Sequence, residues 1–270
     1  MSAARIAVLG AAGKMGRANV KAIVALGETE ARLGVAVAHG ASRALGQDAG
    51  TVAGAAPAGV IIRAELPAAG EADVWVDFSA PAAAGSNAEA AAAAGANLVV
   101  GTTGLAPRDR ERIAGAARTV GVVLSPNMSV GVNVLFKLVA DAARALGPAY
   151  DVEIVEAHHR LKRDSPSGTA LGLAEAVAGA SGLPLSLTAR FERHGDIGPR
   201  AQQEIGLQTI RGGDVFGDHT VHFLGLGDRV EITHRASSRD TFAHGAVRAA
   251  LRLRNRPADL SDMRDVLGLG

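Results

Sequence analysis

The sequence contains no cysteine among its 270 residues. This absence rules out disulfides, thiolate zinc sites and cysteine nucleophiles. Aromatic residues make up only 3% of the chain, so its core must be built from aliphatic side chains. No uncharged apolar run reaches the ~18 residues that a membrane-spanning helix needs, so we expect no membrane span.

An excess of charge of either sign is also missing. The chain has 28 Lys and Arg residues against 27 Asp and Glu residues, which argues against a nucleic-acid binder that depends on bulk charge. An apolar run begins at Arg5 and leaves no room for a signal peptide. Hydrophobic residues make up 48%, and the length suits two modest domains. We therefore expect a cytoplasmic two-domain protein.

The N-terminal region carries a glycine-rich turn. Residues 5–9 form a short apolar run typical of a buried parallel strand, and a helix is predicted over about 15–26. Between them Gly10, Gly13 and Gly16 follow the spacing G-x-x-G-x-x-G, a variant of the dinucleotide-binding turn. Its position after the first strand and at the start of the first helix predicts a cofactor site.

The end of the second predicted strand, residues 33–37, lacks the acidic residue that grips the ribose of NAD. Ala38 and His39 stand there instead, with Arg43 nearby. An arginine and a protonated histidine attract a 2′-phosphate. The sequence therefore favours NADPH, with NADH also accepted.

Strands and helices alternate through residue 128. Further strands are predicted at 60–62, 73–78, 97–100 and 122–124, and helices at 82–94 and 107–120. This alternation is typical of a Rossmann-like, doubly wound parallel sheet. The loops that start at Gly10, Ser79, Gly101 and Ser125 all leave carboxyl ends of strands, where such sheets bind ligands.

The second region has a different pattern. A helix over 130–146 precedes strands predicted at 152–156, 190–193, 204–211, 219–226 and 229–236, with one clear helix among them. This pattern predicts an α+β domain with a mostly antiparallel or mixed sheet. An amphipathic helix over 242–253 and a tail over 259–267 are expected to return to the first domain. We thus predict a dinucleotide-binding domain of 1–128, completed by 240–270, and a substrate-binding and oligomerisation domain of 129–239.

One stretch of the second region is dense in chemistry: Glu156-Ala-His-His-Arg-Leu-Lys-Arg-Asp-Ser-Pro-Ser-Gly-Thr-Ala170. It is expected to follow a strand over 151–156 as a loop and to enter a helix with Ser165 as N-cap. The N–H groups of Ser167, Gly168 and Thr169 at a helix start suit a carboxylate or a phosphate.

This motif resembles the dihydrodipicolinate reductase family of the diaminopimelate–lysine pathway, and matching segments extend from residue 10 to 248. The resemblance implies reduction of a cyclic dicarboxylic imine with NADH or NADPH and release of water. It implies that His158 is the proton donor and that Lys162 works with it. It places His159, Ser167, Gly168, Thr169 and Arg239 at the substrate. Chemically, hydride addition at C4 sends electron density toward the ring nitrogen and C3, which a positioned imidazole can protonate.

The resemblance also implies a homotetramer and cofactor contacts in the loops of the first domain. With their neighbours in those loops, the predicted cofactor-binding residues are Gly10, Ala11, Ala12, Gly13, Lys14, Met15, Gly16, Ala38, His39, Arg43, Gly101, Thr102, Thr103, Pro126, Asn127 and Met128. The histidines show no coherent ligand spacing, so we expect no metal site.

Some interpretations stay open at this point. His219, His222, His234 and His244 are interpreted as structural or surface groups, and Asp77 either braces loops or touches ligand. Two other functions fit parts of the pattern: a dehydrogenase of the aspartate or homoserine type, and a regulator that binds NAD(P) without turnover. Neither explains the His-His pair, Lys162 and the Ser-Gly-Thr turn together.

Overall fold

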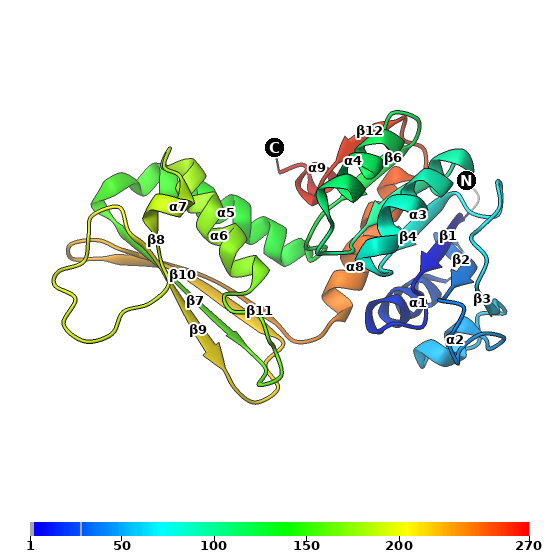
Figure 1. Cartoon of the computed structure of the whole chain (residues 1–270), viewed down its shortest axis with the longest axis horizontal. Coiled ribbons are helices and arrows are strands. Elements are labelled where there is room, and N and C mark those ends of the chain that lie inside the picture. The colour runs from blue at the N-terminus through cyan, green and yellow to red at the C-terminus, as the bar shows by residue number, and fades with distance from the viewer. Residues whose placement is uncertain (1–2, 28, 270) are drawn as a thin grey trace. The chain divides into compact units, whose positions relative to one another are not determined.

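The chain divides into two compact units, of which a computed structural model describes residues 3–27 and 29–269 (Figure 1). Unit 1 is Met1–Val130 with Arg239–Gly270, and unit 2 is Gly131–Ser238. The predicted domain ranges differ from these units by one or two residues at each junction. Residues 1, 2, 28 and 270, which those ranges include, lie outside the described residues.

Unit 1 is built on a parallel sheet in the order β12-β6-β5-β4-β1-β2-β3. The chain adds strands on one side of β1 and then, from β4 onward, on the other, so the strand order reverses beside β1. This is the predicted doubly wound sheet, and the fold class is confirmed. The strands are β1 (Ala4–Leu9), β2 (Ala31–Val37), β3 (Ile62–Arg63), β4 (Val74–Asp77), β5 (Asn97–Val100), β6 (Gly121–Leu124) and β12 (Asp259–Ser261).

Helices cover both faces of this sheet because its strands are apolar on both faces. Ile6 and Val8 of β1 share a core with α1 and α8, whereas Ala7 and Leu9 share a core with α3 and α4. The predicted tail returns to this unit, since β12 pairs with β6. The helices are α1 (Lys14–Leu26), α2 (Ala49–Ala53), α3 (Pro81–Ala93), α4 (Pro107–Ala116), α8 (Asp240–Leu253) and α9 (Met263–Leu267).

Unit 2 holds a mixed sheet in the order β11-β10-β7-β9-β8. The central strand β7 is antiparallel to β10 and parallel to β9. Apolar residues of α5 and α6 pack on one face, with Leu173 and Phe223 among the fully buried side chains. The elements are α5 (Val130–Leu146), a 3₁₀ turn (Gly147–Ala149), β7 (Asp151–His158), α6 (Gly168–Ala180), α7 (Leu185–Thr188), β8 (Ala189–Arg190), β9 (Ile205–Arg211), β10 (Gly217–Leu224) and β11 (Arg229–Ala236).

Several predicted bounds are wrong. The strand predicted at 219–226 runs from Gly217 to Leu224. It ends there because Gly225 begins a turn, in which the Gly225 N–H donates to the Asp228 carbonyl oxygen. The strand predicted at 190–193 shrinks to β8, and Arg193 instead turns its side chain to Glu153 and Glu204. The short helices α2 and α7 were not predicted, since four or five residues carry too little periodicity to detect.

Candidate active site

The glycine-rich turn after β1 has the close contacts of a dinucleotide-binding turn. Gly10 has φ +80°, and an added Cβ there would lie 2.6 Å from the carbonyl oxygen of Phe78. At Gly16, an added Cβ would lie 2.0 Å from the carbonyl oxygen of Gly10. Both positions therefore require glycine, and α1 packs directly on the turn.

The start of α1 presents backbone N–H groups to an anion. The helix begins at Lys14, and its N-cap residue Gly13 has no side chain with which to cap these donors. Beside the turn, an added Cβ at Gly101 would lie 2.2 Å from the ring of Phe78. Close backbone packing around an uncapped helix start fits the pyrophosphate of a nicotinamide dinucleotide.

Asp77 braces two loops at this edge of the sheet. Its buried carboxylate accepts hydrogen bonds from the Ser79 N–H (2.8 Å) and from the Asn87 side chain (2.9 Å). The hydroxyl of Thr102 lies 3.3 Å from the Asp77 carbonyl oxygen and 3.4 Å from its carboxylate. Asp77 thus ties together the loops after β4 and β5. This is the first of the two roles considered for it, bracing loops.

The predicted cofactor residues differ in exposure, and some of them are buried in the core. Ala38 and Met128, for example, are 5% and 2% exposed and belong to the core. The exposed residues are Gly13, Lys14, His39, Arg43, Thr103 and Pro126; Gly10, Ala12, Met15, Gly101 and Asn127 are half-buried; Ala11, Gly16, Ala38, Thr102 and Met128 are buried.

In unit 2, His158 is the last residue of β7, so the prediction that it lies in the loop is wrong. The strand extends to His158 because β9 continues beside it, pairing Arg211 with His158. Burial alternates along β7, so Val152, Ile154, Glu156 and His158 all face inward. A strand therefore holds the imidazole more rigidly than a loop would.

Glu156 sits at the centre of a buried polar cluster. Its carboxylate accepts hydrogen bonds from the Arg211 guanidinium at 2.7 and 2.8 Å and from the Ser167 N–H at 3.0 Å. It also lies 2.5 Å from Nδ1 of His158. The His158 ring meets the ring of His219 edge-on, with centroids 5.2 Å apart. The structure thus brings together side chains from β7, β9 and β10 and the start of α6.

Burial and charge set the protonation of this cluster. Burial raises the pKa of Glu156, but hydrogen bonds from Arg211 and His158 outweigh it and bring that pKa to about 2. Burial lowers the pKa of His158, and the carboxylate of Glu156 offsets only part of the effect. Burial lowers the pKa of His219 to about 4. Near neutral pH, Glu156 is therefore an anion and His219 is neutral.

Ser167, and not Ser165 as predicted, is the N-cap residue of α6. Its hydroxyl accepts from the Ala170 N–H at 3.2 Å and lies 3.2 Å from Nε2 of His219. Its own N–H donates to Glu156. Ser167 thus anchors the helix start from inside, while Gly168 is exposed and Thr169 is half-buried at the same helix start.

Of the remaining predicted residues, Lys162 and His159 follow His158 in unit 2, whereas Arg239 lies in unit 1. Lys162 lies near enough to His158 to lower its pKa, and its Nζ pairs with Asp164 at 2.8 Å. His159 is half-buried, and its N–H donates to the Val215 carbonyl at 2.7 Å. Arg239 is the N-cap residue of α8 and belongs to unit 1.

Sequence reasoning missed three members of this cluster: Glu156, Arg211 and His219. The inward alternation of β7 contained the signal for Glu156, because a carboxylate in line with Val152 and Ile154 must be buried and paired. Arg211 and His219 come from distant strands, so only the sheet pairing identifies them as its neighbours.

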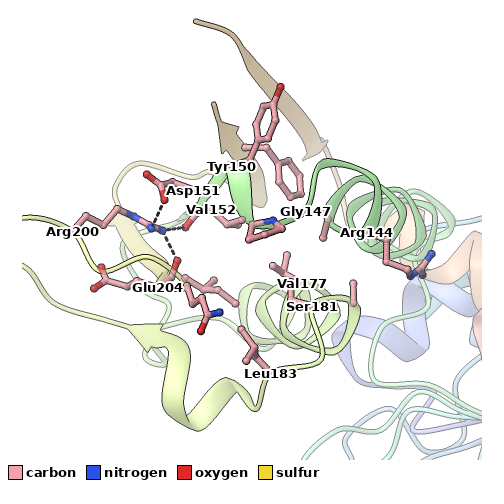
Figure 2. A pocket seen from close by; sticks show the side chains of 16 residues that line it. Arg144, Gly147, Tyr150, Asp151, Val152, Val177, Ser181, Leu183, Arg200 and Glu204 are labelled. Carbon is pink, nitrogen blue, oxygen red and sulfur yellow. Dashed lines mark hydrogen bonds and ion pairs between the residues drawn. The ribbon is translucent and has the colours of Figure 1, made fainter. Parts of the chain in front are cut away.

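A cavity of about 360 Å³ lies elsewhere in unit 2, at the opposite end of β7 (Figure 2). Val152 lines it, six residues before His158, or roughly 20 Å along a strand. Figure 2 shows Arg200 at this cavity bound to Asp151 and to the carbonyl oxygens of Val152 and Glu204. The guanidinium of Arg200 is thus already hydrogen-bonded within the protein. The cavity is separate from the cluster around Glu156 and His158.

Among the described residues, no group of three or more His, Cys, Asp or Glu side chains is arranged to hold a metal ion. Within the same part of the chain, no helix combines the length and the apolarity needed to cross a membrane.

Comparisons with known proteins agree over nearly the whole chain. The family model described as "Dihydrodipicolinate reductase, N-terminus" matches residues 4–128, and "Dihydrodipicolinate reductase, C-terminus" matches 131–267. A 4-hydroxy-tetrahydrodipicolinate reductase from Anaeromyxobacter dehalogenans is 52% identical over 98% of both chains. One from Syntrophotalea carbinolica is 49% identical over 98% of this chain and 99% of its own. The dipicolinate-bound dihydrodipicolinate reductase from Paenisporosarcina sp. TG-14 shares the fold, with a TM-score of 0.74 at 22% identity over 96% and 97% of the chains.

Proposed function

Because the chain belongs to the dihydrodipicolinate reductase family, we propose that it reduces 4-hydroxy-tetrahydrodipicolinate to tetrahydrodipicolinate in lysine biosynthesis. The reaction consumes one hydride, which the reduced nicotinamide supplies when bound, and one proton, and it releases the hydroxyl as water. The near full-length match to relatives about half identical carries this proposal. In this proposal the chain is an oxidoreductase that works in the cytoplasm.

The turn of unit 1 holds the dinucleotide in this proposal. The N–H groups at the start of α1 bind the pyrophosphate, and Lys14 adds a positive charge at the same helix start. Exposed Thr103, next to the braced hydroxyl of Thr102, offers a hydroxyl from the loop after β5. Asp77 keeps that loop in place through its hydrogen bonds.

His158 donates the proton from Nε2. Its Nδ1 is engaged by Glu156 at 2.5 Å, which leaves Nε2 as the atom that faces a ligand. An added Cβ at Gly217 would lie 3.0 Å from this Nε2, so the glycine keeps the approach to it open. The electron pair that hydride addition at C4 pushes to C3 takes this proton.

Cations and helix-start amides bind the two carboxylates of the substrate. Lys162, only 20% exposed, places an ammonium near His158. Gly168 and Thr169 begin α6 and present the positive end of its dipole. The relative from Paenisporosarcina was solved with dipicolinate, a ring with two carboxylates, and this ligand supports the choice of substrate class.

The direct experiment supplies the substrate in situ from the synthase that makes it and follows the loss of reduced-nicotinamide absorbance. Turnover that depends on both the synthase and this chain is the expected result. Tight nicotinamide binding without turnover would instead favour a non-catalytic regulator, and oxidation of aspartate or homoserine would favour another dehydrogenase.

NADPH is the preferred cofactor in this proposal, and NADH is also accepted. Ala38 is buried, but His39 and Arg43 at the end of β2 are exposed, so His39 is the position to test. In His39→Asp, a carboxylate repels the 2′-phosphate, and we expect KM for NADPH to rise about tenfold relative to KM for NADH, or ~1.4 kcal/mol.

His39→Asn is the matched control. The Nδ1 of His39 accepts a hydrogen bond from the Ala41 N–H at 3.1 Å, and both Asp and Asn can keep an acceptor there. Only Asp adds charge, so the Asn variant should keep the wild-type ratio of the two KM values. A wild type that prefers NADH tenfold or more contradicts the NADPH preference.

A homotetramer is the assembly we infer for this reductase. Helices α5 and α6 pack on one face of the unit 2 sheet, and on β10 the residues Thr220 and His222 face the other way. Exposed Ile210 of β9 adds apolar surface to the same face, on the other side of β7. This face suits packing against another chain. Light scattering at micromolar concentration should give about four times the chain mass; a mass near 27.3 kDa would contradict the tetramer.

A further inference from the structure

The carboxylate of Glu156 is buried, although charged side chains usually stay exposed. Its residue is 1% exposed, and its oxygens meet Arg211 twice, the Ser167 N–H and, at 3.3 Å, the hydroxyl of Thr209. Burying an unpaired carboxylate is costly, so a buried carboxylate needs a paired charge or hydrogen bonds. Arg211 alone would satisfy the carboxylate by its two-pronged contact.

The contact with His158 therefore needs its own explanation. Glu156 lies 2.5 Å from Nδ1 of His158, and a carboxylate with a pKa of about 2 accepts hydrogen bonds and donates none. The proton between them must belong to Nδ1. In the neutral imidazole this leaves Nε2 without a proton, ready to receive one and pass it to a ligand.

The same carboxylate also fixes the helix start that faces the ligand. Ser167, whose N–H donates to Glu156, is the N-cap residue of α6. His219, held 3.2 Å from the Ser167 hydroxyl, packs edge-on against His158. One side chain thus connects the imidazole to the amides that are expected to bind a substrate carboxylate.

We propose that Glu156 is the positioning residue of this site, holding His158 as the Nδ1–H form with Nε2 toward the substrate and tying it to the start of α6. The proposal rests on the proposed reductase function. Glu156 touches no reacting atom in this arrangement and acts through His158 and Ser167.

The charges around His158 determine how Glu156 affects its titration. Lys162 and its partner Asp164 come from the loop, Arg211 from β9 and His219 from β10. Burial, Lys162 and Arg211 lower the pKa of His158, and Glu156 raises it. Near neutral pH, His219 is uncharged and does not add to the repulsion. Removing the charge of Glu156 should therefore lower the pKa of His158 further.

Glu156→Gln tests this role in the full-length enzyme. The substitution removes the neighbouring anion, and the amide NH2 can donate to Nδ1, a contact that places the proton of neutral His158 on Nε2. We expect kcat to fall about tenfold or more, a sizeable part of the ~10²–10⁴ that a general acid contributes. We also expect the alkaline limb of the pH–rate profile to move to lower pH.

Glu153→Gln is the matched control on the same strand. Glu153 also binds two arginines, with Arg193 at 2.7 and 2.8 Å and Arg200 at 3.1 Å, but at the other end of β7. It should leave the pH–rate profile unchanged whatever it does to thermal stability. A Glu156→Gln profile that matches the wild type, or an equal shift in Glu153→Gln, overturns the proposal.

¹⁵N NMR of the His158 imidazole shows directly which ring nitrogen carries the proton. This measurement uses the wild-type protein and needs no turnover. The wild type should show Nδ1 protonated and Nε2 unprotonated at a pH above its titration. A neutral imidazole protonated on Nε2 in the wild type overturns the proposal. A wild type that shows the expected form but reduces no substrate contradicts the proposed function instead, so the two failures are distinguishable.

Discussion

His158→Gln should lower kcat by about 10²–10⁴, the usual contribution of a general acid. Glutamine retains polarity and similar reach but cannot transfer a proton to C3. Binding of the nicotinamide should stay close to wild type, because the predicted cofactor residues belong to unit 1 and His158 belongs to unit 2. Single-turnover kinetics and a separate titration of cofactor fluorescence measure the two effects independently.

Lys162→Ala is the contrasting variant. It removes a charge that meets the substrate carboxylate already in the ground state, so KM should rise together with any fall in kcat. If His158→Gln keeps more than about a third of wild-type kcat, far above what loss of a general acid permits, His158 is not the proton donor. His159, its half-buried neighbour, then becomes the better candidate.

The pH dependence of the rate is a second test of His158 as the proton donor. A proton donor must be protonated, so the rate falls as pH rises through the pKa of His158. Burial holds that pKa below its ordinary value in the free enzyme, and kcat/KM reports the free enzyme. A bound dicarboxylate adds negative charge beside the imidazole and raises its pKa. The alkaline limb of kcat should therefore lie at higher pH than that of kcat/KM.

Local sequence signals located most elements of unit 1, although they missed α2. Short apolar runs that end in Gly10, Gly101 and Ser125 are reliable marks of parallel strands, and the two faces of β1 are equally apolar. Gly13 and Gly16 are constrained by Gly10 a few residues away, whereas Gly10 is constrained by Phe78, which follows the paired strand β4. The predicted tail likewise returned to this unit.

The cluster in unit 2 was only partly predictable, for a physical reason. His158 and Lys162 stand in one motif, but the partners of Glu156 come from β9 and from the first residue before α6. Such partners become neighbours only through strand pairing across many residues, which no local pattern records. His219 shows the same limit: interpreted as structural or surface, it packs against the predicted proton donor.

The glycine turn allows a test of unit 1 that does not depend on chemistry. In Gly16→Ala, the new methyl group would lie 2.0 Å from the carbonyl oxygen of Gly10, and neither backbone can yield without moving α1 away from the turn. The N–H groups at the helix start then lose their position relative to the pyrophosphate. We expect the Kd for NADPH to rise about tenfold or more, a loss of ~1.4 kcal/mol or more.

Gly115→Ala separates this effect from the general cost of replacing glycine. Gly115 lies in α4, and among the described residues no atom outside its neighbouring helix backbone comes within 4 Å of a Cβ added there. That variant should bind NADPH like the wild type and gain about 0.4–1 kcal/mol of stability, because alanine restricts the unfolded chain. Gly16→Ala should lose about 1–3 kcal/mol to overpacking, visible as a lower thermal midpoint. A folded Gly16→Ala protein that binds NADPH as tightly as Gly115→Ala would show that the contact of α1 with the turn is not what creates the cofactor site.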